Sequence, residues 1–460
     1  MVGSVLGEPA TLDPVAARAP ADVAVAALLY DTLYRAGADG VVAPHLAAAL
    51  PDVTGTTARI ALRPGARFHD GSPITAADVV ATLTRVRASA AAGWLLAGVD
   101  QIAADGDAVV LTLKAARKDL ALILAAPQTA ITPRGQDPTR AKAVVGSGPF
   151  KLVAARKDRL ELAAHDEHFG GRPYVDKVTL RWFTTPTGEA RLYEIGDAHW
   201  SLRGATSFAG RRPTFPTSEL ESPATVLVYV GFGGGHADVT GDRDFRAAID
   251  AALTRRGLDH VGAGERAKPT QDPVPEELGG PALAEGASDS RLDVARVALT
   301  RAGAAVRALA ADRIGRLTLE ILIDQTRPDD REIAERLVRA LDKLGVRATI
   351  AAVSAPELLR RIATGTCDLY IGQLAAAVPN PGFWFAQAYA VAGERDVADR
   401  LIAGGTVDLA RARAAFAKRL PIVPLLHRAV RVHHRSALRG AWFDASARLG
   451  VADLFLWTTP

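Results

Sequence analysis

Apolar residues recur along the chain with two spacings, every second position in short runs and every third or fourth position in longer ones. The first spacing is typical of strands with one buried face, and the second is typical of amphipathic helices. Beyond residue 316 strand-like and helix-like segments alternate along the chain. The strand-like segments are 317–323, 346–353 and 368–372, and the helix-like segments are 333–344 and the short 357–363. This order predicts a parallel or mixed sheet whose strands are joined by right-handed crossovers.

Residues 62–86 combine two turns with the start of a helix. Pro-Gly at 64–65 and Asp-Gly at 70–71 are dipeptides that reverse the chain direction. Thr75 is a favourable N-cap, and Asp78 three residues later completes an Asp version of the capping box. Apolar residues at helical spacing follow, so we expect a strand end, a double turn and a capped helix here.

The composition limits what the chain can do. With 48% hydrophobic and 23% charged residues it is globular, and its 460 residues suggest two or three domains. The net charge of +4 is too small to indicate nucleic-acid binding. A single cysteine, Cys367, excludes an intrachain disulfide and a cysteine-rich metal site. The sequence contains no run of about 18 apolar residues that would span a membrane.

The block 62–86 also resembles the signature of the family 5 extracellular solute-binding proteins, which include the peptide, dipeptide and nickel receptors of ABC importers. The matching phrases are LRPG at 62–65, FHDG at 68–71 and TAADV at 75–79. Further phrases follow the order of the family, namely EPATLDP at 8–14, YDTL at 30–33, PHLA at 44–47, GSGPF at 146–150 and DRDFRAAI at 242–249. The resemblance therefore covers nearly the whole chain.

The resemblance implies an α/β fold of the periplasmic-binding-protein-like class, with two lobes, mixed sheets, a hinge and a small inserted domain. The first lobe would comprise 1–42, 147–232 and 438–460, the inserted small domain 43–146, and the second lobe 233–437. The chain would cross between the lobes twice, and these crossings would form the hinge.

The resemblance also implies a function. We expect the extracytoplasmic substrate-binding receptor of an ABC importer, which captures a small solute, a peptide or a peptide-like compound, by hinge closure and delivers it to the transmembrane subunits of an ABC permease. It would be a monomer without a cofactor, in the periplasm or on the outer face of the cytoplasmic membrane as a lipoprotein, with its leader absent from this numbering. The alternatives are a solute-sensing or cargo-binding protein not coupled to transport, and a hydrolase on the same fold.

A candidate ligand site follows from the same resemblance. Its residues are Glu8, Trp200, Tyr229, Gln373, Leu374, Ala377, Asn380, Phe383 and Trp384. In peptide-binding members a Trp-x-x-Asp stands where this chain has Leu374 and Ala377, and the Asp pairs with the α-amino group of the ligand. A buried ammonium would lack its counter-charge here, so we expect a neutral, apolar or anionic ligand in preference to a peptide held by its N-terminus. A shift of three residues would bring in Asn380, which carries no charge, and 383–385 could instead fill a core.

Enzyme and metal interpretations have little support in the sequence. Neither a G-x-S-x-G, an H-E-x-x-H, a Walker A loop nor a dinucleotide-binding turn stands in a fitting context, so we expect no catalytic residue. The stretch 165–168, His-Asp-Glu-His, could hold a metal or form a solvated turn, and we favour the turn. His433 and His434 are adjacent in a strand-like stretch and would face opposite sides, which argues against joint ligation.

Overall fold

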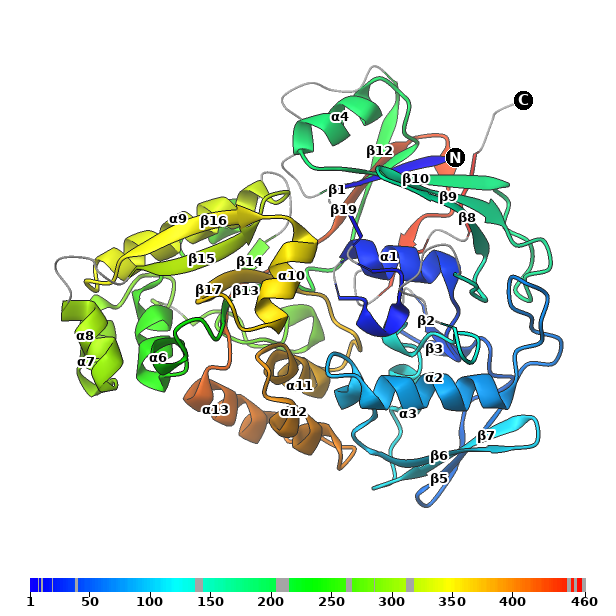
Figure 1. Cartoon of the computed structure of the whole chain (residues 1–460), viewed down its shortest axis with the longest axis horizontal. Coiled ribbons are helices and arrows are strands. Elements are labelled where there is room, and N and C mark those ends of the chain that lie inside the picture. The colour runs from blue at the N-terminus through cyan, green and yellow to red at the C-terminus, as the bar shows by residue number, and fades with distance from the viewer. Residues whose placement is uncertain are drawn as a thin grey trace.

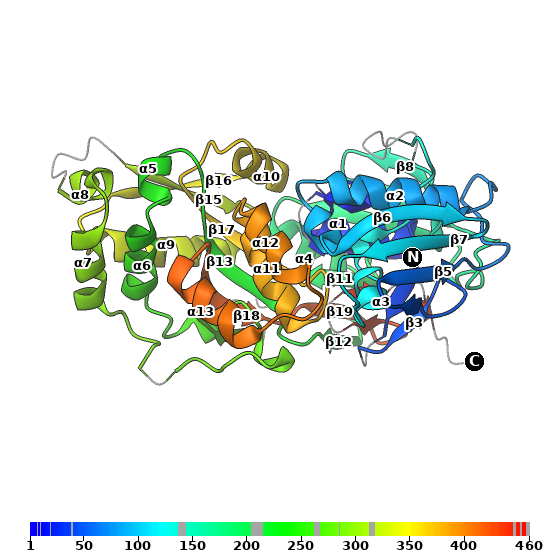
Figure 2. The ribbon, with the colours of Figure 1, turned by 90° about the horizontal axis from the view of Figure 1, so that it is seen from below.

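Three larger β-sheets organise the part of the chain that the structure describes. This computed structural model describes residues 1–460 except 7, 10, 19, 38–39, 137–143, 204–214, 262–266, 285, 312–317, 445–447, 451–452 and 457–460. Figures 1 and 2 show two bodies side by side: the first lobe, on the right, contains the N-terminal strand, and the second lobe, on the left, contains β13 to β18. A small domain lies against the first lobe. The predicted α/β fold with mixed sheets is confirmed.

The first lobe is built on a seven-stranded sheet with the order β12-β19-β11-β1-β10-β9-β8. These strands are β1 (Val2–Leu6), β8 (Phe150–Arg156), β9 (Arg159–Ala164), β10 (Lys177–Phe183), β11 (Trp200–Arg203), β12 (Thr217–Glu221) and β19 (Arg431–Arg435). β1 pairs in parallel with β10 and β11, and the other neighbours are antiparallel. Helix α1 (Pro20–Leu29) contacts β8, and α4 (Pro186–Glu194) contacts β1. The apolar core of this lobe includes Phe150, Leu180 and Trp200.

The second lobe is built on a six-stranded sheet with the order β14-β18-β13-β17-β15-β16. Its strands are β13 (Val226–Phe232), β14 (Ala267–Pro269), β15 (Leu319–Asp324), β16 (Ala348–Val353), β17 (Leu369–Leu374) and β18 (Val423–Arg428). β15 pairs in parallel with β16 and β17, as the alternation of strands and helices predicted. Helices α9 (Pro328–Asp342) and α10 (Ala355–Ala363) form the crossovers, again as predicted, while Leu317 lies outside the described residues.

The small domain has a four-stranded antiparallel sheet of β4 (Asp52–Thr54), β5 (Thr57–Ala61), β7 (Ala108–Leu113) and β6 (Val99–Asp105). Helix α2 (Ala76–Ala88) packs on it and begins with the predicted capping box of Thr75 and Asp78. Gly65 and Gly71 adopt φ of 77° and 84°, the left-handed region that the double turn requires. The predicted strand end, double turn and capped helix in 62–86 are thus confirmed.

Two short segments connect the lobes. Residues 222–225 lead from β12 to β13, and residues 429–430 lead from β18 to β19. The predicted lobe boundaries had placed β13 in the first lobe and β19 in the second, but β13 pairs with β17 and β18, and β19 pairs with β11 and β12. The apolar pattern of a strand indicates how much of it is buried and does not indicate which sheet it joins.

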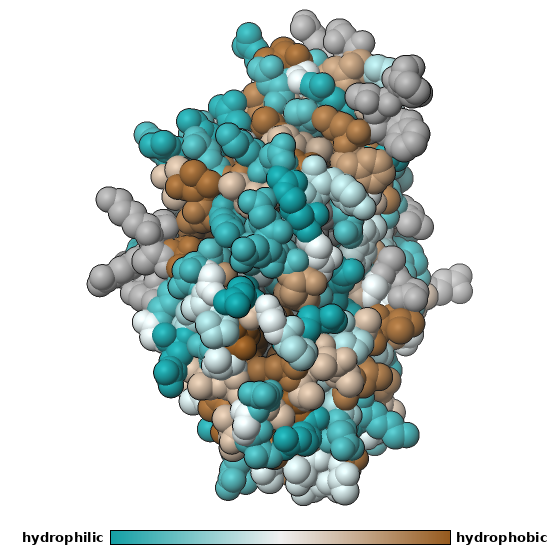
Figure 3. Space-filling model, turned by 90° about the vertical axis from the view of Figure 1, so that its right-hand side faces the viewer, coloured by the Kyte–Doolittle hydropathy of each residue, from teal (hydrophilic) through white to brown (hydrophobic). Residues whose placement is uncertain are grey.

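The remaining helices complete the two bodies. They are α3 (Leu120–Ile123), α5 (Ala237–Thr240), α6 (Arg243–Ala252), α7 (Leu292–Arg301), α8 (Ala304–Ala311), α11 (Pro381–Val391), α12 (Arg395–Ile402) and α13 (Leu409–Arg419), with short 3-10 helices η1 (Pro14–Ala16), η2 (Gly93–Leu96), η3 (Pro127–Thr129), η6 (Leu258–His260) and η7 (Glu276–Leu278). None of the described helices is both long and apolar enough to cross a membrane. The face seen in Figure 3 is largely hydrophilic, with apolar residues scattered over it.

Candidate functional site

A cavity of about 100 Å³ lies between the first lobe, the small domain and the second lobe. The first lobe contributes residues around η1, the small domain contributes η2, and the second lobe contributes β13, α10 and the segment that follows β17. In open α/β sheets ligands bind beyond the carboxyl ends of the strands, and β15 and β17 both end at this cavity. We therefore take it as the candidate site.

Two tyrosines form the floor of the cavity. Tyr229 on β13 lies opposite Gly372 on β17, and Tyr370 on β17 lies opposite Gly231 on β13. A Cβ atom on Gly372 would come within 2.3 Å of the Tyr229 ring, and one on Gly231 within 2.0 Å of the Tyr370 ring. Each ring therefore lies over the glycine of the neighbouring strand. The two rings meet edge to face, with their centroids 5.9 Å apart.

A network of charged and amide groups continues from this floor. Gln373 donates to Asp330 at 3.3 Å and accepts from Arg428 at 2.9 Å. Arg327 pairs with Asp324 at 3.3 Å and lies 3.7 Å from Asp330. Burial raises the pKa of the Asp330 carboxyl to about 6, although Arg327 and Arg428 oppose this. Gln373 is thus held by charged partners on the side away from the cavity.

Two polar side chains line the wall where the first lobe meets the small domain. Arg18 lines the cavity and is exposed. Gln128 in η3 donates through Nε2 to the carbonyl of Ala17 at 2.8 Å. Its Oε1 atom is buried and has no hydrogen-bond partner among the described residues.

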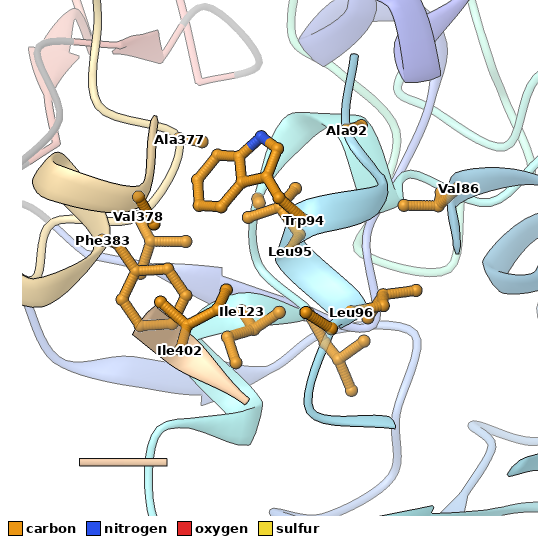
Figure 4. Close-up of a cluster of buried hydrophobic side chains, with 14 of the residues drawn as sticks. Val86, Ala92, Trp94, Leu95, Leu96, Ile123, Ala377, Val378, Phe383 and Ile402 are labelled. Atoms are coloured by element: carbon orange, nitrogen blue, oxygen red, sulfur yellow. The ribbon is translucent and has the colours of Figure 1, made fainter. Parts of the chain in front are cut away.

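The small domain closes the cavity with apolar side chains. Trp94 in η2 is buried, and its ring centroid lies 6.2 Å from that of Phe383 in α11. Figure 4 shows the Trp94 indole directed from the small domain toward Ala377 and Val378 of the second lobe. Arg395 of α12 adds a hydrogen bond of 2.8 Å to the carbonyl of Ser89. The small domain and the second lobe consequently share one continuous apolar cluster.

Four of the predicted site residues line this cavity, namely Tyr229, Gln373, Leu374 and Ala377. The other five lie elsewhere. Glu8 is exposed, and Asn380 caps α11 through its side chain. Trp200 belongs to the core of the first lobe, whereas Phe383 and Trp384 belong to the large shared cluster, as the core-filling alternative for 383–385 described. Ligand contact stays a prediction for the whole set.

Four further residues line the cavity without having been predicted from the sequence, namely Arg18, Trp94, Asp324 and Arg327. Asp324 and Arg327 directly follow a predicted parallel strand, so the rule that ligands bind at the carboxyl ends of strands could have indicated them. No comparable signal marks Arg18 or Trp94, because each reaches the cavity from a loop or a single helical turn of another part of the chain.

The histidines near the signature block connect loops in the first lobe. His69 accepts from the Gly146 amide at 3.0 Å and donates to the Gly148 carbonyl at 3.0 Å, and burial lowers its pKa to about 4. His168 donates to Asp31 at 3.1 Å, and His45 lies 2.8 Å from the same carboxylate. Burial by itself raises the pKa of the Asp31 carboxyl, but the two imidazoles hold this pKa below its usual range.

The tight GSGPF connector packs against the end of α1, because a Cβ atom on Gly146 would come within 1.7 Å of the Leu29 carbonyl oxygen. Within the described ranges, no group of three His, Cys, Asp or Glu side chains is placed to hold a metal ion. The stretch 165–168 instead binds backbone carbonyls and Asp31.

Comparison with known proteins gives a consistent assignment. Residues 41–395 match the family of bacterial extracellular solute-binding proteins, family 5 Middle. Protein XP55 of Streptomyces lividans is 32% identical over 266 residues, which cover 54% of this chain and 47% of that protein. The chain spans about half the length of the curated relatives it matches.

Solved structures resemble the whole described fold. The murein tripeptide binding protein MppA of Escherichia coli has a TM-score of 0.84 at 17% identity, covering 100% of this chain and 98% of that one. NikA of Staphylococcus aureus in complex with Ni(L-His)2 has a TM-score of 0.81 at 17% identity, covering 99% of both chains. At these identities the likeness concerns the fold.

Proposed function

The chain belongs to the family 5 bacterial extracellular solute-binding proteins, and from this premise we propose that it is the extracytoplasmic substrate-binding receptor of an ABC importer. The observation that carries the proposal is the cavity between two lobes that are joined by two short crossings. Proteins of this family bind and do not transform their ligands, and the proposed output is a conformational change without catalysis.

The two crossings support a hinge. Ser222 in one crossing accepts at Oγ from the amide of Val430 in the other at 2.8 Å, and its own amide donates to the Val430 carbonyl at 2.9 Å. The segments 222–225 and 429–430 therefore lie side by side and can bend together. A few backbone dihedrals in such segments suffice for domain closure. A ligand that contacts both lobes then favours the closed state by its difference in affinity for the two states.

This hinge leads to a proposed division of the chain. We assign 1–42, 147–221 and 431–460 to the first lobe, 43–146 to the small inserted domain and 226–428 to the second lobe. This division differs from the one expected from the resemblance at both hinge boundaries. Each boundary is now placed where the chain leaves one sheet and enters the other.

The proposed ligand is a small solute, a peptide or a peptide-like compound. The cavity volume is about 100 Å³, and one water needs roughly 10–15 Å³ by the same measure. In this conformation the cavity therefore fits a molecule of amino-acid size. Tyr229, Gln373, Leu374 and Ala377 are its proposed contacts. Trp200, Phe383 and Trp384 would act from the core by supporting the walls, and Glu8 and Asn380 are not proposed to touch it.

The rest of the proposal concerns partners and place. We propose delivery to the transmembrane subunits of an ABC permease, a monomeric receptor, and a location in the periplasm or on the outer face of the cytoplasmic membrane through a lipid anchor. Closure on the ligand would present both lobes to the permease at once, which is why a monomer suffices.

Thermal unfolding in the presence of a compound panel tests the proposal. The panel contains di- and tripeptides, nickel with histidine, opines and sugars, and a cleft binder raises the stability by RT ln(1 + [L]/Kd). A compound that raises Tm should also reduce the radius of gyration in small-angle X-ray scattering and be recovered unchanged. Stabilisation without compaction, or recovery of a cleaved compound, would contradict the receptor function.

A further inference from the structure

We propose that the interlobe cavity selects a small apolar carboxylate, whose anionic head is bound by Arg18. The inference rests on the proposed receptor function and narrows the ligand within it. It follows from a comparison of the four charged side chains that line the cavity, which are Arg18, Asp324, Arg327 and Arg448.

Three of these four charges are already neutralised within the protein. Asp324 accepts hydrogen bonds from the amide and the hydroxyl of Thr326 at 2.9 and 2.7 Å and pairs with Arg327 at 3.3 Å. Arg448 pairs with Asp444 and donates to a backbone carbonyl at 3.2 Å. A ligand that used one of these groups would have to break an existing pair.

Arg18 differs from the other three. Within the described residues its guanidinium has neither an ion pair nor a hydrogen bond, although the side chain lines the cavity. The positive charge of Arg18 also acts on the two tyrosines of the cavity floor. Burial raises the pKa of both Tyr229 and Tyr370, and the Arg18 charge opposes this increase. Arg18 therefore faces the space that a ligand would fill, with its hydrogen-bond donors free.

The same comparison argues against cationic and doubly charged ligands. Among the described residues that line the cavity, an ammonium group would meet no free carboxylate, since Asp324 is paired and the completely buried Asp330 is not part of the lining. A dianion would place its second charge near Asp324, and the described lining offers no second unpaired cation to balance it. One unpaired guanidinium matches one carboxylate.

The walls indicate what is attached to the carboxylate. Apolar side chains from three parts of the chain face the cavity, namely Val23, Trp94, Leu358, Leu359, Ile362 and Val391. With roughly 10–15 Å³ needed for one water, a cavity of about 100 Å³ accommodates on the order of eight non-hydrogen atoms. A branched hydrocarbon of four to six carbons with one carboxylate fits this description.

Three compounds with the same hydrocarbon test the charge preference: 4-methylpentanoate, 4-methylpentanamide and 4-methylpentylamine carry an anionic, a neutral and a cationic head. Their dissociation constants are measured on the full chain by tryptophan fluorescence and ligand-observed NMR. We expect the acid to bind most tightly. Arg18→Gln should weaken the acid about 10- to 100-fold and the amide much less, because only the acid loses an ion pair as well as a hydrogen bond. Arg18→Lys should restore part of the affinity for the acid.

A matched control removes an equal charge elsewhere. Arg296 is exposed on α7 and does not line the cavity, so Arg296→Gln should bind all three compounds like the wild type. The proposal is overturned if the amine or the amide binds at least as tightly as the acid, or if Arg18→Gln leaves the affinity for the acid unchanged. Binding of the amine with compaction would preserve the receptor function while refuting the acid. Failure of all three compounds also refutes the acid, and the wider panel then decides separately whether the chain binds a solute.

Discussion

Replacing Trp94 by alanine tests whether the contact between the small domain and the second lobe holds the two together. Trp94 is 3% exposed, and its indole nitrogen donates to the carbonyl of Ala91 at 3.1 Å within the small domain. The ring itself faces the second lobe, where it meets Phe383, and Figure 4 shows it directed toward Ala377 and Val378. The hydrogen bond therefore belongs to one domain, whereas much of the apolar contact is made across the interface.

The size of the effect follows from the buried area. A buried tryptophan removes roughly 150–250 Å² from water, which at about 25 cal/mol per Å² corresponds to about 4–6 kcal/mol. Taking half of this contact as made with the second lobe gives about 2–3 kcal/mol that stabilises only the closed arrangement. Since 1.4 kcal/mol is tenfold, Trp94→Ala should shift the equilibrium roughly 30- to 150-fold toward the open state.

Small-angle X-ray scattering without ligand measures this shift, and Trp94→Ala should have a larger radius of gyration than the wild type. Ligand should restore compaction, with an affinity reduced by a similar factor. Trp182→Ala is the matched control, because Trp182 lies on β10 of the first lobe and donates to the carbonyl of Lys157 at 3.1 Å, away from the interface. An unchanged radius of gyration in Trp94→Ala, or an equal increase in both variants, would refute the reasoning.

Two further predictions concern the second lobe. Gly372→Ala would place a Cβ atom within 2.3 Å of the Tyr229 ring, so the ring must move into the cavity, and we expect a loss of about 1–3 kcal/mol in urea unfolding together with weaker ligand binding. Gly404→Ala is the control, because a Cβ atom there meets no atom within 4 Å, and this variant should match the wild type. Equal unfolding midpoints for the two variants would contradict the close approach of the Tyr229 ring to Gly372. Burial lowers the pKa of His427 to about 4 in the folded protein. In the unfolded chain the same imidazole is protonated near its ordinary pKa of about 6.5. The stability that depends on neutral His427 is therefore intact above pH 6.5 and about 3 kcal/mol smaller at pH 4. His427→Gln should lack this loss when urea midpoints at pH 7 and pH 4 are compared, and parallel pH profiles for variant and wild type would show that another group is responsible.

The order of strands and helices in the second lobe could be predicted from local patterns. The elements over 319–374 and the turns and helix of 62–86 depend on periodicity, glycine turns and caps that act within a few residues. The positions of the two crossings between the sheets could not be found in this way. The chain passes from one sheet to the other at 222–225 and at 429–430. The first of these segments, Ser-Pro-Ala-Thr, has the composition of a turn, but nothing in it distinguishes a crossing between two sheets from an ordinary loop.

The candidate site was predictable only on one side. Tyr229, Gln373 and Ala377 stand on or directly after strands of the sheet whose edge forms the cavity, so a rule about strand ends could point to them. Arg18 and Trp94 reach the same space from the first lobe and the small domain. Their contribution depends on how separate bodies pack together, and this information is not present in the local pattern around either residue.

The floor of the cavity is an exception, because its geometry can be derived from sequence once the two strands are known to pair. Both strands contain Tyr-x-Gly, at 229–231 and at 370–372. In the observed antiparallel register each tyrosine lies opposite the glycine of the other strand. If the register between β13 and β17 were shifted by two residues, the same faces of the strands would stay buried. A shift in one direction would pair Tyr229 with Tyr370, and a shift in the other direction would pair Gly231 with Gly372. Only the observed register gives each ring an unobstructed surface to lie on, so the repeated motif both aligns the strands and shapes the floor on which the ligand would rest.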